Sequence, residues 1–361
     1  MITDTAHLWT QLRQLTYRVR NIADDITVVF VANRQHGLSD ASSDRSTEYL
    51  TDYETNQILT GLRESGFRTL YFEGENEFIS FVLAQDGKIS NSKWNIVYNT
   101  AQSGTDPGRK SMVPAFCALH QIPTCNSDSY AVSLARHKLH VHAILRRFNI
   151  PTPDTWAFGA ETGWLRGEQP PNDLLLIAKA GHESASIGLD EASIGIMSLD
   201  FESVLRQKSI DLQQQIVVQK FISGREFELP VINMMNTHRP LDPISITFNG
   251  DAELGERVLL YDLVAKDRFG FTACSSENES EANRMRDAAA NVCEVLGLKG
   301  FARVDFRMDD NLNVWVTDVS TSPHIVMHSS FWHLFEGIGW SHSEMLACMI
   351  AVNAVDLGWL R

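Results

Sequence analysis

The segment FARVDFRMDDNLNVWVTDVST, residues 301–321, has the pattern of an antiparallel β-hairpin. Two runs of alternating apolar and polar residues flank the turn-forming residues 309–311. Residues two apart in a strand share a face, so each strand of the hairpin presents one apolar and one polar face. We expect Met308 to pair with Asn313 across the turn, and this register decides which polar side chains meet.

The polar face of the hairpin combines oxygen donors with one cation. In the expected register four polar residues lie on one side, namely Arg303, Asp305, Asp318 and Ser320. Magnesium prefers a few carboxylates together with substrate phosphates, and two magnesium ions would offset the charge of a transferring γ-phosphate. On this feature alone, the alternative is the solvated polar face of an edge hairpin.

The N-terminal third of the chain predicts a parallel α/β domain. Residues 1–25 form a polar leader with helical character, and strands and helices then alternate along the chain. The expected strands are 26–32, 69–72 and 95–99, and the expected helices are 54–66 and 113–120. Gly66 ends the first of these helices. At 361 residues, the chain is long enough for two or three domains that share one cleft.

The middle of the chain predicts a small α+β unit. One long helix is expected from Ser127 to about Phe148, where Pro151 and Pro153 end it because the residue before a proline leaves helical geometry. Three strands are expected at 174–179, 216–222 and 226–232. The stretch AGHESASIG, residues 180–188, interrupts them with small and turn-forming residues.

Further strands are expected before the hairpin, and helices on both sides of it. The strands are SITFN at 245–249 and the segment 259–266. Ser276 and Glu279 form an S-x-x-E capping box that opens a helix to about Leu296. After the hairpin, an apolar helical tail contains Trp332 and Trp340, which we expect to lie in the core.

The composition excludes some classes of function. The 31 Lys and Arg against 45 Asp and Glu give a net charge of -14, which repels nucleic acid. The five cysteines include no C-x-x-C pair, so we expect neither a disulfide framework nor a zinc site. The longest apolar run, residues 26–32, is too short to span a membrane, and no secretory signal is evident. We therefore expect a cytoplasmic protein with no membrane partner.

The segment STSPHIVMHSS, residues 320–330, resembles the C-terminal motif of D-alanine-D-alanine ligases, in which an Asn-Thr-Ser-Pro-Gly element precedes a His-Ser pair at the same spacing. The matching positions are Thr321, Ser322, Pro323, His328 and Ser329, together with R-x-D at Arg303 and Asp305 upstream. Further matches in family order are Lys138, the loop 179–188, QKFISGREFE at 219–228 and YDLVAK at 261–266. The resemblance covers roughly residues 95–355.

The resemblance implies an ATP-grasp fold of mixed α/β and α+β class. It divides the chain into a parallel α/β domain (1–137), a central ATP-grasp subdomain (138–219) and a C-terminal ATP-grasp subdomain (220–361) with the metal and substrate site. The last two would enclose ATP. The implied activity is an ATP-dependent ligase that joins a carboxylate to an amine through an acyl-phosphate, giving ADP and phosphate. Amino acids or peptide-like molecules would be the substrates, and a homodimer is frequent in such ligases.

Several residues match the family's ATP-binding positions. Lys138 and Lys179 resemble the two lysines that hold the α- and β-phosphates, although each alone would more often be a surface lysine. Ser184 and Ser186 lie in the segment that resembles the phosphate loop, where small side chains let the backbone approach; an ordinary turn is the alternative. The expected adenine and ribose contacts are Gln219, Lys220, Ile222 and Glu226. For Glu226 the alternative is a structural salt bridge with Arg225 or another cation.

Other matches concern the reaction itself. Lys266 resembles a lysine that reaches the γ-phosphate from a closing loop, for which residues 266–274 are the candidate lid. By the same resemblance, Asp305, Asp318 and Ser320 hold two magnesium ions. Arg303 would stabilise the developing oxyanion, Ser329 would hold the carboxylate of the incoming amine, and His324 stands where the family has a glycine beside the oxyanion.

The first-substrate pocket departs from the family pattern. The family's Gly-Gly-x-Ser-x-Glu element does not follow the first strand, where this chain reads NRQHGLSDASSDR at 33–45, and Ala185 and Asp267 replace the usual Ser and Tyr partners. These changes argue against D-alanine as a substrate. Asp52 or Glu54 is a substitute for the missing acid, or a solvent-facing helix carboxylate. The alternatives are D-alanine-D-alanine ligase itself and a catalytically silent ATP-binding regulator, the latter suggested by Ser320 and His324.

Overall fold

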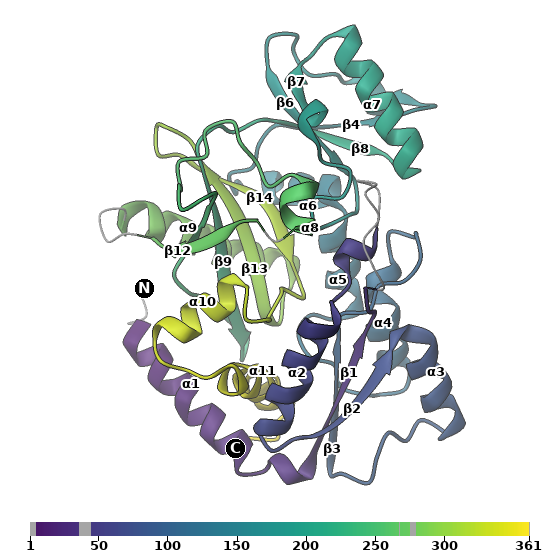
Figure 1. Ribbon diagram of the computed structural model, residues 1–361, viewed down its shortest axis with the longest axis vertical. Coiled ribbons are helices and arrows are strands. Elements are labelled where there is room, and N and C mark those ends of the chain that lie inside the picture. Colours follow the sequence, from purple (N-terminus) through teal and green to yellow (C-terminus); the bar gives the residue numbers. More distant parts are fainter. Residues whose placement is uncertain (1–4, 36–44, 267, 275–278, 361) are drawn as a thin grey trace.

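The computed structural model describes residues 5–35, 45–266, 268–274 and 279–360, and contains three β-sheets (Figure 1). The sheet nearest the N-terminus has the order β2-β1-β3 and is parallel throughout. Its strands are β1 (Ile26–Ala32), β2 (Arg68–Glu73) and β3 (Trp94–Asn99). All three predicted strands are confirmed. Every residue of β1 is buried, as expected for the central strand of a covered parallel sheet.

The helices around this sheet include one that the sequence did not suggest. The bounds are α1 (Thr5–Arg20), α2 (Asp52–Glu64), α3 (Gly74–Ala84) and α4 (Met112–Leu119). The predicted α2 and α4 are confirmed, and Thr51 caps α2 through a capping box with Glu54. The helix α3 was not predicted because its residues, GENEFISFVLA, follow β2 without a turn signal.

The middle unit is an antiparallel sheet covered by α7 (Leu199–Leu212), seen at the upper right of Figure 1. The order is β5-β4-β8-β6-β7. The strands are β4 (Thr155–Gly159), β5 (Gly163–Trp164), β6 (Leu175–Ala180), β7 (Ile194–Ile196) and β8 (Ile216–Lys220). The predicted strands β6 and β8 are confirmed, and the segment 180–188 connects β6 to the residues that precede β7.

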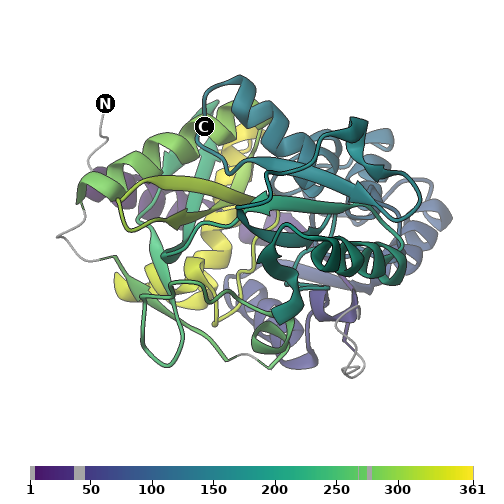
Figure 2. The same ribbon diagram turned by 90° about the horizontal axis from the view of Figure 1, so that it is seen from above.

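The third sheet contains the predicted hairpin. The order is β12-β11-β9-β13-β14, with β10 paired to β9. The strands are β9 (Arg225–Met234), β10 (Thr237–Pro240), β11 (Ile244–Thr247), β12 (Gly270–Ala273), β13 (Gly300–Met308) and β14 (Val314–Ser320). The helix α9 (Glu279–Leu296) packs on the apolar face of this sheet, and Figure 2 shows it along the outer side. Its predicted N-terminal cap, Ser276, lies outside the described residues.

The register of the hairpin differs from the predicted one. Met308 pairs with Val314 rather than with Asn313, and the register shifts between Asp305 and Phe306. This β-bulge adds one residue to β14, so that Asp305 pairs with Asp318. Without the extra residue, a strand period of two would turn Asp318 toward the apolar face. The prediction of the shared polar face is therefore confirmed, but the predicted pairing of Met308 with Asn313 was wrong.

The long helix predicted from Ser127 to Phe148 is two helices, α5 (Ser129–Arg136) and α6 (Lys138–Arg147). His137 separates them because its backbone is extended, with φ -97° and ψ 90°. The N–H of Lys138 donates to the carbonyl of Gly181 at 3.1 Å, a contact between segments far apart in the sequence. The break places Lys138 in the first turn of a helix that faces the segment 180–188.

The segment 259–266 was predicted to be a strand and is not one. Residues Tyr261–Ala265 form the short helix α8. Leu259, just before the helix, and Leu263, within it, pack against a small cluster around Phe248. A run of apolar residues this short does not distinguish a strand from a helical turn, and packing decided between them.

The last two helices join the third sheet to the first. They are α10 (Ser330–Gly337) and α11 (His342–Asp356), and α11 packs against both α1 and α2. Trp340 is 4% exposed and Trp332 packs against the same core, as predicted. The core that contains Trp340 joins residues from both ends of the chain, and the core under α5 and α6 joins residues 131–150 to the third sheet. Both cores cross the expected domain boundaries, and the division at residues 137 and 219 stays a prediction. No described helix has the length and apolar character needed to span a membrane.

Candidate active site

A cavity of about 530 Å³ opens between the three sheets, within the size range of small-molecule sites. Every predicted site residue except Lys266 lines it. From the middle unit and its approach come Lys138, Lys179, Ser184, Ser186, Gln219, Lys220 and Ile222. From the third sheet and the segment after it come Glu226, Arg303, Asp305, Asp318, Ser320, His324 and Ser329. The predicted set is thus brought together in space.

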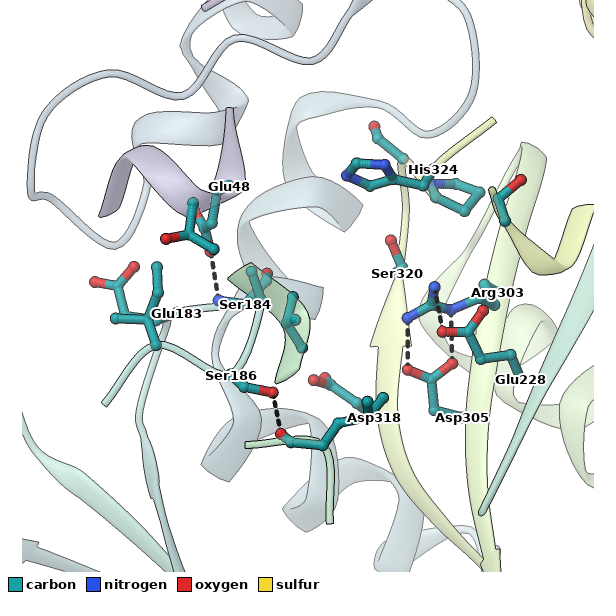
Figure 3. Close-up of a pocket in the computed structure, with 18 of the residues that line it drawn as sticks. Glu48, Glu183, Ser184, Ser186, Glu228, Arg303, Asp305, Asp318, Ser320 and His324 are labelled. Carbon is teal, nitrogen blue, oxygen red and sulfur yellow. Dashed lines mark hydrogen bonds and ion pairs between the residues drawn. The ribbon is translucent and has the colours of Figure 1, made fainter. Parts of the chain in front are cut away.

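Arg303 is held between two carboxylates on the floor of the cavity (Figure 3). Its guanidinium donates to Asp305 at 2.7 and 2.8 Å and lies 2.7 Å from Glu228, on the neighbouring strand β9. Burial and the nearby Glu228 and Asp318 raise the pKa of Asp305 to about 7 despite Arg303. This crowding of carboxylates around one arginine favours a further cation at the site.

Magnesium fits this side of the cavity in partnership with phosphate. Asp305 and Asp318 are directly opposite each other on paired strands, and one buried oxygen of Glu228 has no hydrogen-bond partner within the described part of the chain. No three described His, Cys, Asp or Glu residues surround a single point as a complete metal site would require. An ion here would therefore take its remaining ligands from a substrate, as magnesium commonly does with nucleotide phosphates.

The two predicted phosphate lysines, Lys138 and Lys179, lie on either side of Asp318. The Lys138 ammonium lies 3.4 Å from Asp318 and donates to the carbonyl of Glu183 at 2.5 Å. Burial lowers the pKa of Lys179, which stands on β6, while Asp318 opposes that shift. Burial would raise the pKa of Asp318, but Lys138 and Lys179 lower it below its usual value. Asp318 is thus a carboxylate between two lysines, with a third of its side chain exposed.

The predicted phosphate loop has an unusual backbone. Ala185 and Ser186 both have positive φ angles, 50° and 54°. These angles lie in the left-handed region, which is unfavourable for residues other than glycine. Such conformations persist where surrounding contacts hold them, often at ligand sites. The Ser186 hydroxyl donates to the carbonyl of Leu259 at 2.5 Å, and the Ser184 N–H donates to Glu48. The loop is therefore tied to two other parts of the chain.

The predicted adenine and ribose residues lie along the connection from β8 to β9. Apolar side chains of Ile177, Phe221 and Val258 line the cavity there and form one small cluster. The Gln219 amide contacts His142, so its side chain is already occupied. Glu226 faces the cavity but also accepts from Arg307 at 3.1 Å, so the alternative of a salt bridge is realised with a cation other than Arg225.

The two remaining predicted substrate residues lie near the start of α10. Ser329 is the N-cap of that helix: its hydroxyl accepts from the N–H of Trp332 at 3.2 Å and donates to the carbonyl of Val326 at 2.8 Å. His324 lies above Ser320 in Figure 3. Burial lowers the pKa of His324, and the positive charge of Arg303 adds to that effect. His324 therefore contributes a neutral imidazole to the cavity lining.

Lys266 differs from the rest of the set. It follows α8, is exposed, and forms an ion pair with Asp262 one helical turn earlier, at 2.6 Å. It is absent from the described cavity lining. Its proposed role at the γ-phosphate stays a prediction, because it requires movement of the segment 266–274, and Asp267 within that segment lies outside the described residues.

A buried network of charges was missed by the sequence analysis. Glu48 lies 2.6 Å from Arg136 and 2.9 Å from Arg109, and Arg109 also lies 2.5 Å from Glu183. Arg45 completes the network at 3.0 Å from Glu183. Figure 3 shows Glu48 and Glu183 on the opposite side of the cavity from Arg303. The network joins the N-terminal domain, α5 and the phosphate loop at one point.

One signal in the sequence could have identified Glu48. Ser46, Thr47 and Glu48 repeat the Ser-x-Glu half of the family element that was sought directly after β1. This half of the element stands instead after the longer segment 33–45. Of the substitutes considered, Asp52 is exposed and pairs with Arg34, whereas Glu54 closes the cap of α2 at the cavity edge.

Comparison with known proteins identifies the family of this architecture. The family model described as D-ala D-ala ligase C-terminus matches residues 153–351. A D-alanine–D-alanine ligase of Pseudomonas putida (strain GB-1) is 24% identical over 241 residues, which are 66% of this chain and 70% of that protein. The structure of the D-alanine–D-alanine ligase from Bacillus anthracis complexed with ATP superposes with a TM-score of 0.66 at 16% identity, covering 91% of this chain and 97% of the other.

A second solved structure shows the same fold. It is the VanG D-Ala:D-Ser ligase from Enterococcus faecalis, with a TM-score of 0.64 at 16% identity, covering 91% of this chain and 99% of that one. At these identities the likeness shows the fold alone, and it confirms the expected ATP-grasp arrangement of mixed α/β and α+β class.

Proposed function

The chain belongs to the D-alanine–D-alanine ligase family and is an ATP-dependent ligase that joins a carboxylate to an amine; from this premise we propose that it works through an acyl-phosphate made in the cavity described above. One arrangement carries the proposal. Lys138 and Lys179 flank Asp318, and Asp305 pairs with Arg303, in the lining of one cavity. Cations for a polyphosphate, carboxylates for a metal and a guanidinium for a reacting carboxylate thus meet in one place.

In the first step the substrate carboxylate oxygen attacks the γ-phosphorus of ATP, and the bond to ADP breaks. Lys138 and Lys179 hold the phosphates, and the small residues of the loop at Ser184 and Ser186 let the backbone approach them. Positioning and neutralisation of charge supply most of the rate in such a transfer. Magnesium, held by Asp305 and Asp318 with phosphate oxygens, would supply further positive charge, and Ser320 is the third proposed donor.

In the second step the amine nitrogen attacks the acyl carbon, phosphate leaves, and the amine loses a proton. Arg303 lies where negative charge develops on the acyl oxygen and would stabilise it. The hydroxyl of Ser329 and the neutral imidazole of His324 border the same space and are proposed to position the substrates. The acyl-phosphate reacts with water, so the cavity must exclude solvent during this step.

Oxygen-isotope transfer provides the sharpest test of this chemistry. The purified protein is incubated with ATP, magnesium and a panel of amines and carboxylates labelled with ¹⁸O in the carboxyl group. We expect ADP, an amide product and one ¹⁸O atom in the released phosphate, because the attacking oxygen leaves with phosphorus. Unlabelled phosphate, or AMP with pyrophosphate, would overturn the acyl-phosphate proposal. D-alanine belongs in the panel because the relatives carry its name.

The remaining features of the proposal concern partners and location. We propose small amino acids or peptide-like molecules as substrates, a homodimer in solution and a site of action in the cytoplasm, with no nucleic-acid partner. Light scattering coupled to gel filtration tests the proposed homodimer directly: a mass of 40.5 kDa would mean a monomer, and twice that mass the expected dimer.

A further inference from the structure

The wall of the cavity at the end of β3 contains a lysine that no step above uses. Lys110 belongs to a short 3₁₀ turn, Arg109–Ser111, and lines the cavity beside Glu48 and Arg136. The Asn99 amide donates to the carbonyl of Lys110 at 3.5 Å, and Arg109 donates to the carbonyl of Gln102 at 3.0 Å. The turn is therefore fixed against the loop that leaves the parallel sheet.

The positive charge of Lys110 has no direct partner within the described part of the chain. Among the residues that the structure describes, its ammonium makes no hydrogen bond and no ion pair. Burial lowers the pKa of Lys110 to about 8, and Arg136, Arg109 and Arg303 add to the shift while Glu48 opposes it. The group is still mostly protonated near pH 7. An uncompensated ammonium that borders a cavity is a binding group for an anion.

Glu48, which acts on the charge of Lys110, and Glu183 are already paired with arginines. Glu48 is shared by Arg136 at 2.6 Å and Arg109 at 2.9 Å, and Glu183 by Arg109 and Arg45. Four cations, counting Lys110, thus surround two carboxylates on this wall. The wall presents excess positive charge to a ligand, whereas the opposite floor around Arg303 carries excess negative charge.

Thr100 lines the same cavity one residue after β3, and the Asn99 amide joins this strand end to the backbone of Lys110. The strand end and the lysine therefore belong to one wall of the cavity, on the side of the N-terminal sheet.

We propose that the acyl donor of this ligase carries a second anionic group, as a dicarboxylic acid does, and that Lys110 binds that group. The proposal rests on the proposed function, since it names the substrate class of the same site. A donor with an ammonium at this position would meet the like charge of Lys110, and Glu48 beside Lys110 is already paired with two arginines. Like charges brought together in a desolvated site strongly disfavour such a donor.

Hydroxylamine makes the test independent of the unknown amine, because it converts any acyl-phosphate into a hydroxamate. The probes are donors that differ at one end: butyrate with a methyl group, β-alanine with an ammonium and succinate with a carboxylate, together with D-alanine and D- and L-aspartate. ADP and hydroxamate are measured for each. We expect kcat/KM to be at least about 30-fold higher for succinate or an aspartate than for butyrate, β-alanine and D-alanine.

The outcomes of this screen separate the two proposals. If butyrate, β-alanine or D-alanine supports hydroxamate formation better than every dicarboxylate, the ligase stands and the inference about Lys110 falls. If no donor in the panel raises ADP release above the rate with hydroxylamine alone, the proposed function falls and the inference falls with it.

Substitution at Lys110 then assigns the effect to this side chain. Lys110→Met removes the charge and keeps the length; it should lower kcat/KM for the preferred dicarboxylate by about 30-fold or more and leave the KM for ATP within about twofold. Lys110→Glu should in addition raise the activity with β-alanine. Lys88→Met, at an exposed lysine of the same domain outside the cavity lining, is the matched control and should change neither value.

Two results would overturn the role of Lys110. One is a raised KM for ATP with an unchanged order of donors, which would make Lys110 a nucleotide-phosphate ligand. The other is an unchanged kcat/KM for the dicarboxylate in a Lys110→Met protein. Retained binding of an ATP analogue shows that each variant is folded, so a loss confined to the donor cannot come from misfolding.

Discussion

The two sides of the cavity use charge in opposite ways. On the side of the hairpin and the lysines, Asp318 stands between Lys138 and Lys179 with no contact shorter than 3.4 Å to either, and it remains open to the cavity. On the side of the N-terminal sheet, Glu48 contacts Arg136 and Arg109 at 2.6 and 2.9 Å and is nearly inaccessible. We call the first the open side, because its charges remain available to ligands, and the second the closed side, because its charges are paired with one another.

This contrast separates charges that are available to bind ligands from charges that stabilise the fold. A buried carboxylate satisfied by two arginines shapes the wall and connects domains, but it has little left to offer a substrate. A loosely paired carboxylate or an unpaired lysine keeps its capacity for a metal, a phosphate or a substrate anion. On the N-terminal side, the described residues of the network form no ion pair with Lys110, whose charge stays available to a ligand.

Lys179→Met should have the largest effect on activity. Removal of a phosphate-binding cation from the open side should lower kcat/KM for ADP release by about 1000-fold, as loss of one preorganised electrostatic group does in other enzymes. Steady-state kinetics with the best donor measures this. Lys299→Met, at an exposed surface pair 3.1 Å from Asp128, is the control and should leave kcat/KM unchanged.

Glu48→Gln should have the largest effect on stability. Burial would raise the pKa of Glu48, but Arg136 and Arg109 outweigh it and lower the pKa to about 2 from the ordinary 4.5. The folded state therefore binds fewer protons than the unfolded chain between these values, so the stabilisation is present above pH 4.5 and is lost as the pH falls toward 2. Urea unfolding at pH 7 should show a loss of about 3 kcal/mol.

The pH dependence checks the cause of that loss. Between pH 4.5 and the lowest pH at which both proteins fold, the parent protein should lose stability more steeply than the Glu48→Gln variant. Parallel curves would show that Glu48 is not an ionised partner of Arg136 and Arg109. The closed side would then be held by something other than charge.

Lys266→Met should reduce activity by about tenfold or less, far less than Lys179→Met. Lys266 is exposed and paired with Asp262 outside the cavity lining, whereas Lys179 faces Asp318. Rates of ADP release from the two variants, assayed side by side, decide the matter. A loss as large as that of Lys179→Met would show that the segment after α8 closes over the phosphates and that Lys266 reaches them.

Arg146→Ala should have the smallest effect. The Arg146–Asp154 pair is as short as those of the buried network, at 2.7 Å, but both side chains are more than half exposed. Solvent screens such pairs, so urea unfolding should show a loss of about 1 kcal/mol or less. A loss equal to that of Glu48→Gln would mean that burial does not explain the difference between the two sides of the cavity.

The open side was largely predictable from local patterns. The hairpin follows from alternation around a turn, and the resemblance of 320–330 to a family motif identified the neighbouring positions. Lys138 and Lys179 were found in the same way and line the cavity. Their individual roles stay predictions until the variants are assayed.

The closed side was not predictable in the same way. Glu48, Arg109, Arg136 and Glu183 come from four separate segments, and none of them belongs to a periodic pattern that signals pairing. Glu48 alone carried a motif, Ser-x-Glu, which a longer preceding segment moved away from the place where it was sought. A contact between residues distant in the chain leaves no mark in either local sequence.

Periodicity and short motifs, which act over a few residues, were enough to predict the three sheets' main strands, most helices and the shared polar face of the hairpin. Three details came from packing between distant segments. These are the bulge that pairs Asp305 with Asp318, the break at His137 that turns Lys138 toward the loop, and the network of Glu48 with Arg136 and Arg109 beside Lys110. Each depends on which groups neutralise or crowd one another in space, a property of the folded chain that no window of sequence contains.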